Sequence, residues 1–100
     1  MYVGRRYDSC WHFVQEYYKN EYSITLHEHT YKSADLFEEI QAPATGAVVI
    51  VEKGGHCGIY QNGKMLHQRN TQIGVVRERL RNYKPTYYQL RHSSSSGGTA

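Results

Sequence analysis

Apolar and aromatic side chains recur at helical spacing near the start of the chain. Five of them follow an i, i+3, i+4, i+7, i+8 pattern: Cys10, Phe13, Val14, Tyr17 and Tyr18. Positions with this spacing share one face of an α-helix. Asp8 and Ser9 are good N-cap residues just before the pattern, and Asn20 is a plausible end. The pattern therefore predicts an amphipathic helix over residues 10–20.

The pattern weakens in the next part of the chain. Residues 22–31 are polar and indicate an excursion between helices. A short second helix is expected to start at Ser33 and to end before Pro43, because proline cannot continue a helix. The apolar side chains that this helix would bury are Leu36, Phe37 and Ile40.

From Gly46 onwards the pattern becomes that of β-strands. Residues 47–51, Ala-Val-Val-Ile-Val, are apolar on both alternating faces, which is typical of a central strand covered on each side. Two further strands are expected at residues 73–77 and 86–90. The pair Asn62-Gly63 lies between the central strand and these two strands. It readily supplies the positive φ angles of a type I′ turn, so residues 56–68 are predicted to form a hairpin.

The order of these elements predicts an α+β protein. Its N-terminal helix would pack on one face of an antiparallel meander of about four to five strands. A chain of 100 residues is long enough for one core, so residues 1–91 are expected to form a single domain. Residues 92–100, four serines followed by Gly-Gly-Thr-Ala after His92, are expected to be a flexible Ser/Gly-rich tail.

Composition and charge exclude several classes of protein. Hydrophobic residues make up 39% of the chain, as in a globular domain, and the formal charge is only +3. The basic residues are scattered, apart from a modest strip: Arg77, Arg79, Arg81 and Lys84. This strip could bind an anionic polymer or a partner protein, but it is too sparse for a nucleic-acid arm. No apolar run approaches the roughly 20 residues of a membrane span, and residues 1–6 lack the apolar core of a secretory signal.

Cys10 is the first candidate for chemistry. A cysteine attacks as the thiolate, and the start of a helix favours an anion because its backbone N–H groups are unpaired there. The expected hairpin supplies a base for this thiol. Its register sets Gly58 opposite His67, and alternation places the side chain of His56 on the same face as both. The two imidazoles are then diagonal neighbours, with Cα atoms roughly 7 Å apart, and only Gly58 lies between them.

The arrangement has the logic of a catalytic triad, in which a third group orients the base. The residues also resemble a known family, the NlpC-type papain-like cysteine peptidases. Ser9-Cys-Trp-His-Phe-Val14 is similar to its nucleophile helix, written Asp-Cys-Ser-Gly-Phe-Val, and to the Cys-Trp form found in phage tail members. Gly46-Ala-Val-Val-Ile50 resembles its Gly-Asp-Val-Val-Phe strand, and residues 56–67 resemble its His-Val-Gly-Ile-Tyr segment, which ends in a second histidine.

The resemblance implies roles for several residues. Cys10 would be the nucleophile, His56 the base and His67 the third polar residue, while Tyr7 (or Tyr2) and Gly58 would bind substrate. The implied activity is cleavage of peptide or amide bonds in the stem peptides of bacterial peptidoglycan, without a metal or organic cofactor. The expected setting is a phage tail-associated protein, located in the virion or in the host cytoplasm before assembly, with other tail proteins as partners.

Other interpretations stay open at this point. One is a structural tail-assembly protein that keeps the fold without hydrolysis, and a weaker one is a cysteine acyltransferase or deamidase. A zinc site is disfavoured, because the candidate ligands around Cys10, His27, His29 and His56 lie in three separate elements without a zinc-binding spacing. Cys57 projects from the opposite face to His56, so it is expected to be structural and unbridged to Cys10.

Overall fold

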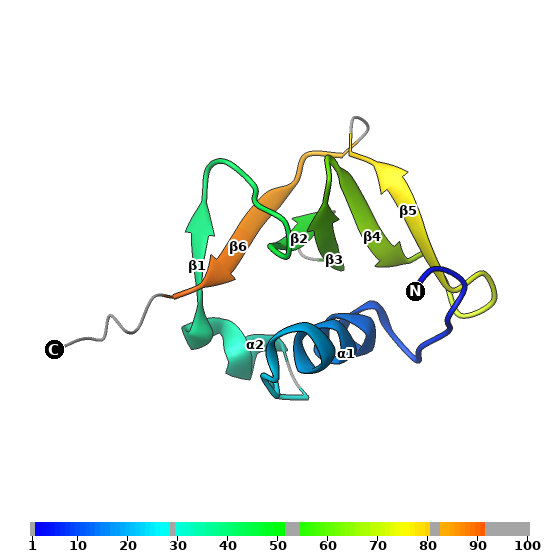
Figure 1. Cartoon of the computed structure of the whole chain (residues 1–100), viewed down its shortest axis with the longest axis horizontal. Helices are drawn as coiled ribbons and strands as arrows, with labels where there is room; N and C mark the ends of the chain where they lie inside the picture. The colour runs from blue at the N-terminus through cyan, green and yellow to red at the C-terminus, as the bar shows by residue number, and fades with distance from the viewer. Residues whose placement is uncertain (1, 29, 52–54, 81–82, 92–100) are drawn as a thin grey trace, which may run out of the picture.

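The computed structural model describes residues 2–28, 30–51, 55–80 and 83–91. Within these ranges one long helix, α1, covers one face of a single antiparallel sheet of six strands (Figure 1). The elements are α1 (Cys10–Tyr22), α2 (Thr30–Ser33), η1 (Ala34–Leu36), β1 (Phe37–Ile40), β2 (Val48–Val51), β3 (His56–Gln61), β4 (Lys64–Gln68), β5 (Val75–Arg79) and β6 (Thr86–Leu90). The α+β class is confirmed, whereas the expected number of strands was too low.

Helix α1 begins where the sequence pattern places it. The Ser9 hydroxyl accepts a hydrogen bond from the backbone N–H of His12 at 3.1 Å, which satisfies one of the unpaired donors of the first turn. The helix runs two residues past the expected end at Asn20. It ends where Ser23 adopts a left-handed conformation, with φ of 57°, and donates its N–H to carbonyl groups of the last turn.

The expected second helix is only partly present. Ser33 ends the short α2 and caps the three-residue 3₁₀ helix η1, but the helix does not continue to Pro43, because Phe37 begins strand β1. This strand pairs with β6, where Phe37 lies opposite Leu90, so its backbone groups find partners about fifty residues away instead of within a helix. Leu36, expected in the core, is 44% exposed.

The strand order is β1-β6-β2-β3-β4-β5. Strands β2 to β5 form the expected meander, but β6 returns to lie between β1 and β2, so the meander describes only four of the strands. β2 is central and buried on both faces, as its apolar sequence predicts. β5 starts later than expected, at Val75, because Gly74 turns the chain with φ of 81° and leaves Ile73 on the surface.

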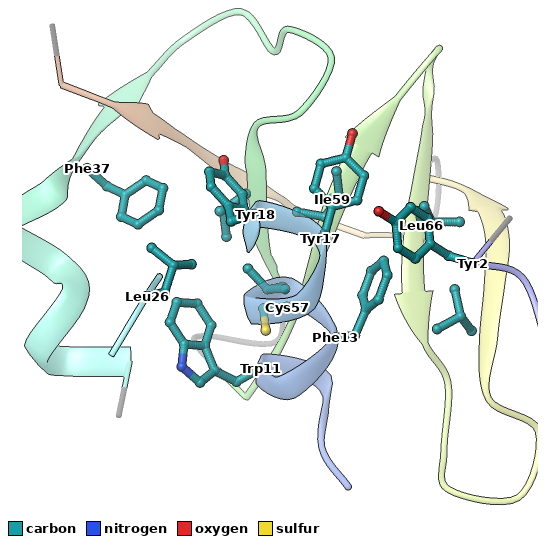
Figure 2. Close-up of a cluster of buried hydrophobic side chains, with 13 residues drawn as sticks. Tyr2, Trp11, Phe13, Tyr17, Tyr18, Leu26, Phe37, Cys57, Ile59 and Leu66 are labelled. Carbon is teal, nitrogen blue, oxygen red and sulfur yellow. The ribbon is translucent and has the colours of Figure 1, made fainter. Parts of the chain in front are cut away.

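The hairpin of β3 and β4 has the predicted register. Asn62 and Gly63 both have positive φ, 52° and 81°, and Gln61 pairs with Lys64 across the turn. The sheet therefore presents two faces of different character. The face toward α1 carries the main core, in which Cys57, Ile59 and Leu66 meet aromatic side chains of the helix (Figure 2).

The opposite face has a smaller cluster of Val49, Val51 and Met65, flanked by partly buried Leu80 and tyrosines. No helix in the part of the chain described is long and apolar enough to cross a bilayer. The tail expected at residues 92–100 lies outside the described residues.

Candidate active site

Cys10 is the first residue of α1 and is half-buried where the helix meets the sheet. Because α1 packs directly on β3, the Cys10 sulfur lies 3.4 Å from that of Cys57, which donates a hydrogen bond to it. This bond lowers the pKa of Cys10 to about 4. A hydrogen bond from His56 acts in the same direction, and partial burial opposes both. Cys10 is therefore the thiolate of the pair.

Cys57 has the opposite character. The hydrogen bond to Cys10 and burial among the core side chains both raise the pKa of its thiol, so it stays protonated. Alternation along β3 does place Cys57 and His56 on opposite faces, as the sequence predicts. Cys57 is unbridged to Cys10, as expected, but the two sulfurs are in contact, because the helix covers the face that carries Cys57. Both thiols are free.

His56 opens β3 and hydrogen-bonds Cys10 from the end of that strand. Its Nε2 lies 2.7 Å from Nδ1 of His67, and the two rings meet edge to face with their centroids 4.8 Å apart. This is the contact that the hairpin register predicts. Since Nε2 of His56 is engaged with His67, Nδ1 is the atom left for the Cys10 sulfur.

Gly58 makes the histidine contact possible. A Cβ at this position would lie 2.6 Å from the carbonyl oxygen of Leu66 and 2.7 Å from the Cβ of His67. Both distances are far inside van der Waals contact, so a side chain there would push β3 away from β4. The structure thus gives Gly58 a packing role, and its binding of substrate stays a prediction.

Glu78 is the residue that sequence reasoning missed. It lies on β5, and its Oε1 is 2.6 Å from Nε2 of His67. His67 is only 2% exposed, and burial lowers its pKa despite the neighbouring carboxylate. A neutral His67 would donate its Nε2–H to Glu78 and accept a hydrogen bond from His56 at Nδ1. The second oxygen of Glu78 lies 3.9 Å from a guanidinium nitrogen of Arg69.

A signal for Glu78 does exist in the sequence. In the observed register Met65 lies opposite Glu78 and His67 opposite Val76, so Glu78 and His67 are diagonal neighbours on one face. Reading this from the sequence requires the register of β4 with β5. No tight Asn-Gly turn defines it, because residues 69–74 join the two strands.

Tyr7 lies close to the start of α1 and packs on Phe13, with ring centroids 5.6 Å apart. The side-chain amide of Gln68 hydrogen-bonds both the N–H and the carbonyl of Tyr7. The Tyr7 hydroxyl is buried and has no partner among the residues described. Tyr2, the other candidate for this role, donates its hydroxyl to Glu21 near the far end of α1. Tyr7 thus lies at the start of α1, away from Tyr2, and its binding of substrate stays a prediction.

The remaining candidates do not join this site. No group of three or more His, Cys, Asp or Glu side chains within the four described ranges could hold a metal ion, and His29 lies outside those ranges. Of the basic strip, Arg77 and Arg79 are exposed on one face of β5, and Arg81 also lies outside the described residues.

The model of the NlpC/P60 family matches residues 3–94, a range that includes the helix, the hairpin and Glu78. No curated protein matches the chain.

Proposed function

Since the chain belongs to the NlpC/P60 family, whose members are cysteine peptidases or amidases that act on peptidoglycan, we propose that it hydrolyses amide bonds in peptidoglycan stem peptides. Cys10 is the nucleophile, His56 the acid and base, and His67 the residue that orients His56. The observation that carries this proposal is the continuous hydrogen-bonded series from Cys10 through His56 and His67 to Glu78.

The first step follows from the charge state of Cys10. Its thiolate attacks the carbonyl carbon of the scissile amide and forms a tetrahedral intermediate with a negatively charged oxygen. The backbone N–H of Cys10 belongs to the first turn of α1, where donors lack partners within the helix. This N–H and the helix dipole stabilise the oxyanion.

The second step uses the histidine pair. Protonated His56 gives the proton at Nδ1 to the leaving amine, the C–N bond breaks and a thioester on Cys10 remains. His56 then accepts a proton from water, which attacks the thioester and releases the acid. During both transfers His67 holds Nε2 of His56, so the ring cannot rotate away from the sulfur.

The test is cleavage of purified peptidoglycan and of a synthetic stem peptide by the full chain. We expect new free amino groups to appear with wild-type protein and to be absent with Cys10→Ala. His56→Ala should be equally inactive. His12→Ala is a matched control, since His12 lies on the exposed side of α1 two residues from the nucleophile and should keep activity. Equal activity of Cys10→Ala and wild-type protein would refute the proposal.

We also propose that this activity belongs to a phage tail. The Cys10-Trp11 pair resembles the form found in phage tail members, which supports a wall-degrading protein attached to a tail. Mass spectrometry of purified virions tests this location. Stoichiometric copies without any wall cleavage would instead favour the structural tail-assembly role. Transfer of the acyl group to an added amine, faster than to water, would favour an acyltransferase.

A further inference from the structure

The contact between Cys10 and Cys57 lowers the pKa of the nucleophile, but it also brings two thiols together, which hydrolysis does not require. The two sulfurs come from α1 and β3, are separated by 47 positions in sequence, and lie 3.4 Å apart. Hydrolysis requires a base and an orienting group beside the nucleophile, and histidines fill both roles. A second thiol in direct contact adds a chemistry that the triad does not use.

We propose that Cys10 and Cys57 form a reversible intramolecular disulfide when the protein meets a hydroperoxide, and that this bond blocks the nucleophile. In this reaction Cys10 is the attacking residue and Cys57 the resolving residue. The proposal goes beyond hydrolysis, because it needs only the two thiols and an oxidant.

The first step takes place at the more accessible sulfur. The Cys10 thiolate attacks one oxygen of the hydroperoxide, an S–O bond forms and the O–O bond breaks. The sulfur is oxidised by two electrons to a sulfenic acid, and the peroxide is reduced and leaves as hydroxide or alkoxide, which takes up a proton. Cys10 suits this role because it is a half-exposed thiolate, whereas Cys57 is 6% exposed and protonated.

The second step is prepared by the first. The thiolate of Cys10 is the main reason that Cys57 holds its proton, so conversion of Cys10 to a neutral sulfenic acid removes that cause. The Cys57 sulfur then attacks the Cys10 sulfur, an S–S bond forms and the S–O bond breaks. Hydroxide leaves and combines with the Cys57 proton as water.

The geometry allows this bond with a small movement. A disulfide is about 2.05 Å long, so the two sulfurs need to approach by roughly 1.4 Å. Cys10 begins its helix and Cys57 is the second residue of its strand, so the approach falls at the ends of both elements. The buried position of Cys57 also protects it from direct oxidation, which favours the order of steps proposed.

The experiment follows thiol chemistry by mass and needs no substrate. The full chain is treated with hydrogen peroxide, its remaining thiols are capped, and tryptic peptides are analysed. We expect the Cys10 peptide to be joined to the Cys57 peptide, both thiols to disappear together, and dithiothreitol to restore both. In Cys57→Ser, Cys10 should instead accumulate as a sulfenic acid that dimedone traps, and then proceed to irreversible sulfinic acid.

Two outcomes would overturn the proposal. One is the same dimedone adduct in wild-type protein and in Cys57→Ser, which would show that Cys57 does not resolve the sulfenic acid. The other is a link between chains, seen as mixed-isotope peptides when ¹⁵N-labelled and unlabelled chains are oxidised together. This isotope experiment uses wild-type protein, so it distinguishes an intramolecular from an intermolecular disulfide even if the Cys57→Ser variant does not fold. An inactive chain can still form the disulfide, and an active one can fail to, so the two proposals are tested separately.

Discussion

Glu78 on β5 lies 2.6 Å from Nε2 of His67 on β4, and this pair ends the hydrogen-bonded series that begins at Cys10. A buried imidazole of this kind has two nitrogens that both need a partner. Glu78 supplies one of them and so determines which nitrogen of His67 carries the proton. The orientation of His56 therefore depends on a carboxylate two strands away from it in the sheet.

Glu78→Gln tests this dependence. Glutamine keeps an oxygen acceptor but loses the charge, and hydrogen bonds to charged groups are worth about 1.5–3 kcal/mol against about 1 kcal/mol for neutral ones, so kcat should fall roughly tenfold. Glu78 is also the contact that raises the pKa of His67 against burial, so imidazole titration by NMR should show that pKa moving lower in the variant. Glu28→Gln, at an exposed position, is the matched control. An unchanged His67 titration would contradict the assignment.

Alkylation of Cys10 across pH should report the hydrogen bond from Cys57. With its pKa lowered to about 4, Cys10 is a thiolate at every pH above that value, and the rate should fall only as the pH drops through it. Cys57→Ala removes the largest cause of this lowering, so the midpoint should move to higher pH. Iodoacetamide kinetics with peptide mapping give both curves. A wild-type midpoint near that of a free thiol, about 8.5, would contradict the geometry.

Gly58→Ala should damage both folding and chemistry. The added Cβ meets backbone and the Cβ of His67 at less than 3 Å, and overpacking of this kind costs about 1–3 kcal/mol of unfolding free energy. Gly63→Ala is the comparison, because its Cβ would meet nothing and only the positive φ is strained. Urea denaturation compares the two variants. Activity per folded molecule should fall in Gly58→Ala and persist in Gly63→Ala.

Tyr7→Phe should leave the protein as stable as before or more so. The Tyr7 hydroxyl is buried without a partner in the region described, and removal of such a group relieves a desolvation penalty of about 1–3 kcal/mol. Thermal unfolding measures this effect. A rise in KM without loss of stability would assign the hydroxyl to substrate binding. A clear loss of stability would contradict its unpaired state.

Local signals in the sequence predicted much of this site. Helical spacing placed Cys10 at the start of α1, and the Asn62-Gly63 turn fixed the register that joins His56 to His67. Both signals act over a few residues, where backbone geometry leaves few choices.

The errors share a different origin. Strand β1 forms because it pairs with β6 about fifty residues later, and its apolar spacing suits a short helix equally well. Glu78 depends on a register defined across a longer loop. The contact of Cys57 with Cys10 was not predicted, because alternation gives two faces without saying which one the helix covers. The apolar composition of the face that carries Ile59 and Leu66 held that information.

The position of Cys10 at the start of the first helix has a consequence for protein synthesis. The nucleophile leaves the ribosome first, but the groups that activate it, His56 and Cys57, follow more than forty residues later. Until the hairpin has emerged and α1 has docked on it, the thiol has ordinary reactivity. A nascent chain therefore carries no activated nucleophile. Enhanced reactivity of Cys10 toward an electrophile marks completion of the fold.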